Sequence, residues 1–180
     1  HNPEVITEAA FNELDVFLKN GGGLIWFSGG IESDPVYLKY FSNLRFPVAT
    51  RKIDLNSGRF NVMMPVKENH ILSDLNIRKL SNELPEVFSY VKHITKANQK
   101  VHLELNNGDP FLIDFDRGSG KIFYFTSLLN LSWNDFTLRG LLIPLMHKLL
   151  ILGGTDEINS LPILIGDSKW IILNGNEERN

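Results

Sequence analysis

A glycine-flanked apolar run, NGGGLIWFSGG at residues 20–30, constrains the fold more than any other feature of the sequence. Before it, residues 8–19 place apolar side chains at the spacing of one helix face, and Thr7 can cap the first turn. The run itself is short and continuously apolar, which predicts a strand covered on both faces, as in a parallel sheet. A helix, a tight glycine turn and a buried strand form half of an α/β winding unit. We therefore expect an α/β protein.

The second half of the chain carries antiparallel strand signals. Residues 101–105 alternate apolar and polar side chains, and NNGD at residues 106–109 is a hairpin signal. PFLIDF follows as the return strand, and RGSG at residues 117–120 turns into KIFYFT. These patterns predict a β-meander that completes a parallel core, so the sheet should be mixed.

Two further helices and a tail complete the expected organisation. Asp34 suits a helix cap and Pro35 the first position of a helix that continues to about residue 44. Residues 138–152 predict a strongly apolar helix, in which a proline is tolerated only near the first turn. We expect one α/β domain over residues 1–154. Residues 155–180 would then form a short β-rich tail, either a hairpin or the start of a following domain.

Composition excludes several functional classes. The chain has 18 basic and 21 acidic residues, a formal net charge of -3, and no cluster of Lys and Arg, which argues against a nucleic-acid partner. It contains no cysteine, so disulfides, thiolate metal sites and cysteine nucleophiles are excluded. The most apolar stretch, residues 141–152, is shorter than the roughly 20 residues that a membrane span needs.

Small polar residues follow two of the predicted strands, and they define a candidate crevice. In open α/β sheets, ligands bind beyond the carboxyl ends of the strands. The candidate crevice comprises Ser28, Gly29, Gly30, Thr126, Ser127 and Trp133. The alternative interpretation is structural: small residues let the chain turn, and Trp133 with Phe136 fastens its loop to the core while Asp135 caps the following helix.

No catalytic, cofactor or metal motif is complete. The pattern G-x-S-x-G around Ser28 has Trp26 at its first glycine position, and no motif nominates a histidine as base. The glycines lack the G-x-G-x-x-G spacing of nucleotide-binding loops, and the histidines lack metal-ligand spacing. Asp114 and Asp116 alternate with apolar neighbours, which is typical of a solvated strand face. We therefore assign no catalytic residue, no metal and no cofactor.

Four segments between Ile6 and Gly154 carry a family resemblance. They are FLKNGGGLIWFSGG, NHILSDL, GDPFLIDFDRGSGKIFYFTSLLNLSWNDF and LLIPLMHKLLILGG. In this order they resemble the soluble domain of aerotolerance-regulator-like (Bat-type) bacterial membrane proteins, which is similar in fold to class I glutamine amidotransferases. The chain departs from the family pattern at Asn69-His70-Ile71, where the family has a His-Pro pair.

The resemblance implies a flavodoxin-like three-layer sandwich without glutaminase activity, because the nucleophile of amidotransferases is a cysteine. In related domains one or two strands precede the first helix, so either this chain lacks those first strands or they lie outside this sequence. If they are absent, a sheet edge is exposed. Transmembrane helices flank such domains in the family. The resemblance thus implies a membrane-anchored parent protein, with this domain outside the cytoplasm and the membrane reached only through segments absent from this chain.

Three functional hypotheses follow. The first is a non-catalytic structural or protein-interaction domain, excised from a bacterial membrane-anchored protein, that binds a protein partner or a second copy of itself. The second is a small-molecule-binding domain that uses the candidate crevice at the carboxyl edge of the sheet. The third is a diverged serine hydrolase with Ser28 as nucleophile, which requires a histidine within hydrogen-bond reach of Ser28.

Overall fold

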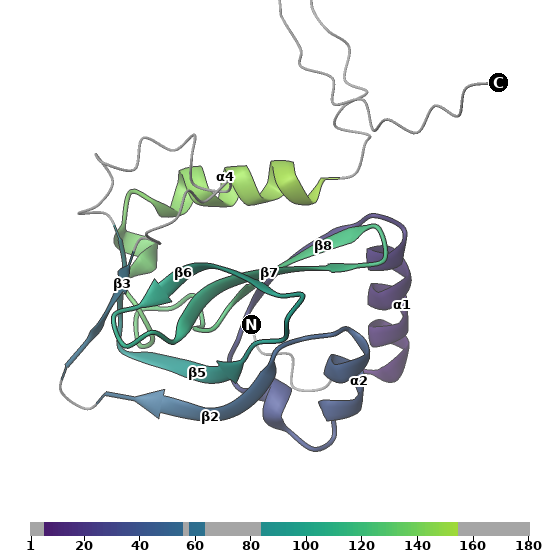
Figure 1. Ribbon diagram of the computed structural model, residues 1–180, viewed down its shortest axis with the longest axis horizontal. Helices are drawn as coiled ribbons and strands as arrows, with labels where there is room; N and C mark the ends of the chain where they lie inside the picture. The colour runs from purple at the N-terminus through teal and green to yellow at the C-terminus, as the bar shows by residue number, and fades with distance from the viewer. Residues whose placement is uncertain (1–5, 56–57, 64–83, 155–180) are drawn as a thin grey trace, which may run out of the picture.

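Helix α1 and strand β1 form the predicted opening of the fold. The computed structural model describes residues 6–55, 58–63 and 84–154 (Figure 1). Helix α1, Glu8–Lys19, begins after Thr7, whose side chain accepts a hydrogen bond from the Ala10 N–H at 3.2 Å. Gly21 adopts a left-handed conformation with φ of 99°, and the chain turns into strand β1, Gly23–Phe27.

A mixed six-stranded sheet in the order β1-β8-β7-β6-β3-β4 forms the centre of the molecule. β1 runs parallel to β8, Gly120–Phe125. β8, β7 (Pro110–Arg117) and β6 (Lys100–Leu105) form the predicted antiparallel meander. β3 (Phe60–Met63) and β4 (Glu86–Val87) extend the sheet beyond β6. The α/β class and the mixed sheet are confirmed.

Helices cover both faces of this sheet. α1 and α2, Leu38–Asn43, pack on one face, and α4, Leu142–Gly153, packs on the other (Figure 1). The core under α1 and α2 includes Phe11, Leu18, Phe41, Ile113, Phe115, Ile122 and Tyr124. The core under α4 includes Leu112, Phe123, Phe125, Leu145 and Leu149. Alternate residues of β8 therefore belong to opposite cores, as expected for a strand covered on both sides.

A separate two-stranded ribbon lies beside the sheet. It pairs β2, Val48–Asp54, with β5, Ser89–Ile94, in antiparallel register (Figure 1). The Val91 N–H of β5 donates to the Thr126 carbonyl at 2.8 Å, so the ribbon contacts the chain where β8 ends. Two short 3-10 turns, η1 (Ile31–Ser33) and η3 (Phe136–Leu138), lie in the connections.

The helix boundaries differ from the predicted ones. α2 begins at Leu38, because Asp34 instead closes a turn by accepting the Val36 N–H at 2.9 Å. The apolar segment after residue 135 divides into η3 and α4, and Pro144 lies in the first turn of α4, where it leaves no intrahelical hydrogen bond unmade.

Strand β1 is half-buried, although a strand covered on both faces was predicted. The reason is its position: β1 is the last strand of the sheet at this side within the described residues. The buried face of helix α1 also differs from the predicted one. The spacing predicts a buried stripe of Ala10, Leu14, Phe17 and Leu18. Phe17 is nevertheless 52% exposed, whereas Phe11, outside that stripe, is buried. Hydrophobic spacing identified the elements and did not identify which of them lies at an edge.

Some predictions fall on residues outside the described ranges. These are the segment NHILSDL with its departure from the family pattern at Asn69-His70-Ile71, and the β-rich tail at residues 155–180. In the described part of the chain, no helix combines the length and apolar character needed to cross a membrane.

Candidate functional site

The sheet brings most of the candidate crevice residues together. Ser28 follows β1, Thr126 and Ser127 follow β8, and the Ser28 N–H donates to the Phe125 carbonyl at 2.8 Å. Because β1 and β8 are parallel neighbours, their carboxyl ends lie at the same edge of the sheet. Trp133 reaches this edge through its backbone, since its carbonyl accepts the Ser89 N–H at 3.0 Å.

Strand β5 occupies the space beyond these strand ends. The Ser127 hydroxyl donates to the Ser89 carbonyl at 2.8 Å, and the Thr126 hydroxyl donates to the Pro110 carbonyl at 2.8 Å. Ser28, Thr126 and Ser127 are fully buried. The hydroxyl groups at the strand ends thus satisfy backbone carbonyls of neighbouring segments, which supports a structural role for them.

A buried carboxylate, Glu32, organises the turn after β1. One of its oxygens accepts the indole N–H of Trp26, and the other accepts the Ser28 hydroxyl at 3.1 Å and the Gly30 N–H at 3.0 Å. Gly30 is left-handed, with φ of 94°, which lets the chain fold back so that η1 presents Glu32 to the strand end. Glu32 was not predicted as a site residue, because its only signal in the sequence is an acidic residue four positions after Ser28.

Tyr124 and His93 form a second buried pair beside Glu32. The Nδ1 atom of His93 lies 2.7 Å from the Val91 carbonyl and its Nε2 atom lies 2.8 Å from the Tyr124 hydroxyl. These partners assign the neutral ring, with the proton on Nδ1 and Nε2 accepting from Tyr124. Burial lowers the pKa of His93 to about 4. Burial, and then the charge of Glu32, raise the pKa of Tyr124 well above its usual value.

This arrangement does not assemble a serine nucleophile with a histidine base. Ser28 donates to Glu32, and His93 bonds to Tyr124 and Val91. Among the described residues, no hydrogen bond joins the Ser28 hydroxyl to a histidine. The fully buried Ser28 hydroxyl is instead held in place by its hydrogen bond to the carboxylate.

A pocket of about 270 Å³ lies next to Glu32, on the side facing α2. It is formed between α2, the start of β2 and the turn after β5. Its lining residues are Glu32, Leu38, Phe41, Ser42, Phe46, Pro47, Val48, Ala49 and Lys96. Most of these side chains are apolar, and Glu32 and Lys96 contribute the charges. Of the predicted crevice residues, none lines this pocket.

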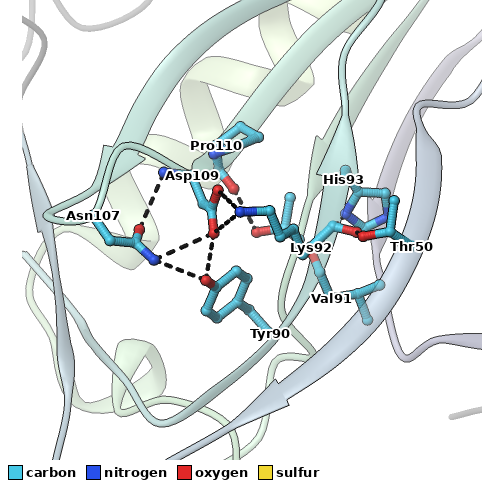
Figure 2. A network of polar contacts seen from close by, with 9 residues as sticks. Thr50, Tyr90, Val91, Lys92, His93, Asn107, Asp109 and Pro110 are labelled. Carbon is cyan, nitrogen blue, oxygen red and sulfur yellow. Dashed lines mark hydrogen bonds and ion pairs between the residues drawn. The ribbon is translucent and has the colours of Figure 1, made fainter.

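A polar cluster on the other side of β5 fastens the ribbon to the sheet (Figure 2). Tyr90 and Lys92 of β5 both point toward Asp109, in the turn between β6 and β7. The Tyr90 hydroxyl donates to Asp109 at 2.5 Å, and the Lys92 ammonium lies 2.8 Å from the same carboxylate. Asn107 donates to the Tyr90 hydroxyl at 2.9 Å and to Asp109 at 3.2 Å.

The charges in this cluster shift two pKa values. Burial alone would raise the pKa of Asp109, but hydrogen bonds from Lys92 and Tyr90 outweigh it and hold this pKa below its usual value. Burial and the hydrogen bond to Asp109 raise the pKa of Tyr90 to about 12. At neutral pH the cluster therefore contains a neutral phenol and an ionised carboxylate, the states in which all its donors and acceptors match.

Replacing Asp109 with alanine is expected to destabilise the fold by about 2–3 kcal/mol, because the buried Tyr90 hydroxyl and the Lys92 ammonium lose a shared acceptor. Chemical denaturation followed by circular dichroism measures the loss. Asp116→Ala is the matched control: Asp116 lies on exposed β7 surface and pairs with Lys121 at 3.4 Å, so its loss should be below about 1 kcal/mol. Equal losses would show that the cluster does not hold the ribbon in place.

Asp114 was predicted to lie on a solvated strand face, and this prediction is wrong. The residue is buried, and its carboxylate lies 2.9 Å from His102 Nε2 and 2.9 Å from the Lys121 ammonium. Burial would raise the pKa of Asp114, but the hydrogen bonds from His102 and Lys121 outweigh it and lower this pKa. The prediction failed because both faces of β7 are covered, so only Asp116 near the strand end reaches solvent.

The loop of Trp133 is fastened to the core as the structural alternative proposed. Trp133 and Phe136 are both buried, and the Lys52 ammonium lies 4.6 Å from the Trp133 ring. Asp135 precedes η3 but makes no side-chain cap there; it accepts the Glu86 N–H at 2.8 Å and pairs with Arg139. It therefore ties η3 to β4 instead of capping a helix.

Comparison with solved structures shows the fold. The chain is similar to cytoplasmic protein STM1381 from Salmonella typhimurium LT2, with 23% identity and a TM-score of 0.67, over 86% of this chain and 64% of that one. Cytoplasmic protein STM3548 from Salmonella typhimurium matches with 20% identity and a TM-score of 0.58, over 83% of this chain and 62% of that one. A β-galactosidase from Bacillus circulans sp. alkalophilus matches with 19% identity and a TM-score of 0.56, over 82% of this chain but only 21% of its own.

These comparisons correct the family prediction. No protein-family model and no curated protein sequence matches the chain. The resemblance to Bat-type proteins and to amidotransferases is wrong, because the structures reported above that match this chain are two Salmonella proteins and a β-galactosidase. Its motifs were glycine turns and apolar strands, which many α/β sheets share. The predicted membrane-anchored, extracytoplasmic location is also wrong, since the two Salmonella structures are described as cytoplasmic proteins.

Proposed function

We propose that this chain is a non-catalytic protein-interaction domain that associates with a second copy through the open edge of β1. The observation that carries the proposal is the position of β1. Within the described residues it pairs on one side only, with β8, and its sequence GLIWF contains no charge and no proline. An apolar strand edge of this kind is a template for pairing with another strand.

The backbone groups of β1 that face the open edge can be identified. The Ser28 N–H points to β8, because it donates to the Phe125 carbonyl. Backbone N–H groups alternate in direction along a strand, so the N–H groups of Ile25 and Phe27 point away from β8. An antiparallel pair of two β1 strands would satisfy these groups symmetrically, as a two-fold interface requires.

Apolar helix surfaces flank this edge on both sides of the sheet. α4 packs against β1, and Gly153 at its end contacts Gly23 at the start of β1. On α4, Ile143 is 74% exposed and Leu150 is 62% exposed, and Ile151 extends the same stripe. On α1, Phe17 covers the glycine turn that leads into β1 and is itself half-exposed. Pairing at β1 would bring these side chains out of water.

We also propose a finer description of the fold, a flavodoxin-like three-layer core. A sheet covered by α1 and α2 on one face and by α4 on the other supports a flavodoxin-like three-layer core. The parallel part of this core is small, because β1 and β8 are the one parallel pair among the described strands. Antiparallel pairing at the edge of β1 would continue this mixed sheet into the second copy.

Replacing Ile25 with proline should abolish self-association, because proline removes the N–H that faces the open edge, a position where strands tolerate it. Ile25→Ala is the matched control, since it removes the same side chain and keeps the N–H. We expect light scattering after size exclusion to show dimers for the parent chain and for Ile25→Ala, and monomers for Ile25→Pro. A parent chain that stays monomeric as its concentration rises would overturn the proposal.

A further inference from the structure

Glu32 is a buried carboxylate whose hydrogen-bond donors are all neutral. It is 2% exposed and accepts the Trp26 indole N–H, the Ser28 hydroxyl and the Gly30 N–H. Among the described residues, no Lys, Arg or His forms an ion pair with it. Buried carboxylates in proteins are normally paired with a cation, since removing a charge from water is costly. Glu32 therefore has donors but no compensating positive charge.

The pocket beside Glu32 can hold a small organic molecule. Its volume of about 270 Å³ exceeds the roughly 150 Å³ of an apolar cavity that binds benzene. Phe41 and Phe46, both buried, contribute aromatic rings to its wall. Aromatic faces attract cations as well as apolar groups, so the wall and the carboxylate favour the same kind of ligand.

We propose that this pocket binds a small organic cation, with an ammonium head directed at Glu32 and an apolar body against Phe41 and Phe46. The ammonium would supply the positive charge that Glu32 lacks, in a charge-assisted hydrogen bond. Lys96 is the one cation that lines the pocket among the described residues. It lies on the exposed rim, where solvent screens it, and its ammonium donates to the Phe46 carbonyl at 3.1 Å.

Three probes with one ring and different charges test the proposal: benzylamine, benzyl alcohol and benzoate. The readout is the Trp26 indole N–H signal in ¹H–¹⁵N NMR spectra, because this group donates directly to Glu32. We expect benzylamine to shift the signal saturably and benzyl alcohol to bind at least about tenfold more weakly. Benzoate should bind most weakly. Equal affinity for benzylamine and benzyl alcohol, tighter binding of benzoate, or no saturable shift by benzylamine would each overturn the proposal.

Variants at two positions, Ser42 and Lys96, locate the binding. Ser42→Phe should fill the pocket from the exposed face of α2 and abolish the benzylamine response, whereas Ser42→Ala should leave it unchanged. Both leave Glu32 and its donors in place, so neither depends on the stability of that buried turn. Lys96→Met should bind benzylamine as tightly as the parent chain or more tightly. A response that survives Ser42→Phe, or that Lys96→Met eliminates, would contradict the proposed position of the ammonium group.

Discussion

Replacing Gly120 with alanine is expected to cost at least about 3 kcal/mol of unfolding free energy, a large part of the roughly 5–15 kcal/mol that stabilises an ordinary domain. A Cβ atom at this position would lie 2.2 Å from the Leu18 carbonyl oxygen and 2.4 Å from the Gly22 carbonyl oxygen. Both oxygens belong to the backbone where α1 ends and turns into β1. Neither can move without lifting the helix off the sheet, so the clash cannot be relieved by a change of rotamer.

Gly108→Ala separates this steric effect from backbone strain. Gly108 has a φ of 83°, but nothing lies within 4 Å of an added Cβ, so only strain of about 1–2 kcal/mol is expected. Urea denaturation of both variants, followed by circular dichroism, compares the two losses. If Gly120→Ala fails to fold while Gly108→Ala folds, the larger loss expected at Gly120 is likewise supported. A loss at Gly120 no larger than that at Gly108 would contradict the close packing of α1 on β8.

The elements with strong local sequence signals could be predicted, because those signals determine where the elements form. The capped helix at Thr7, the glycine turn and the apolar strand at residues 23–27 all form where the sequence places them. The hairpin at residues 106–109 also forms, with Gly108 in the left-handed conformation that such turns require. Each of these signals operates over a few residues, so no knowledge of the tertiary fold is needed to interpret it.

The position of each element within the sheet could not be predicted in the same way. β1 has the composition of a central strand, yet it is the last strand on its side among the described residues. Asp114 has the alternation of a solvated strand, yet it is buried beside His102. Strand β2 and its pairing with β5 were not predicted. β2 is mostly exposed and carries Arg51 and Lys52, so it has no hydrophobic period to identify it. Partners distant in sequence decide these features.

The candidate site, too, could be predicted only in part. The sequence predicted that Ser28 and Thr126 each follow a strand, and the parallel pairing of β1 with β8 places them side by side. What surrounds Ser28 does not follow from it, because Glu32 reaches the site through a left-handed glycine and Tyr124 comes from the core side of β8. Chemistry that depends on a buried acid was therefore invisible in the sequence, although the acid lies only four residues from the serine.

Lowering the pH from about 6.5 to about 4 is expected to cost about 3 kcal/mol of stability through His93 alone. Burial lowers the pKa of this ring from 6.5 to about 4 in the folded protein. The unfolded chain binds a proton at this histidine below about pH 6.5, while the folded protein does not until about pH 4. Stability is therefore complete above pH 6.5 and falls between these values, at about 1.4 kcal/mol for each unit of pKa difference.

Protonation would also break a specific contact. A charged ring would carry a proton on Nε2, so it could no longer accept the hydrogen bond from the Tyr124 hydroxyl. Asp15, Asp54, Asp109 and Asp114 all have lowered pKa values, so their contributions are lost at lower pH, below the ordinary value of 3.8. The interval between pH 6.5 and 4 is thus governed by histidine.

Urea denaturation at several pH values tests this expectation with two variants. His93→Gln should be less stable than the parent chain at pH 7 but should lose little more between pH 6.5 and 4, because it has no buried ring to protonate. His147→Gln changes an exposed histidine on α4 and should keep the full pH dependence of the parent chain. If the parent chain were equally stable at pH 6.5 and pH 4, then His93 would have to accept its proton without leaving its place between Val91 and Tyr124. The hydrogen bonds assigned to that ring would then be wrong.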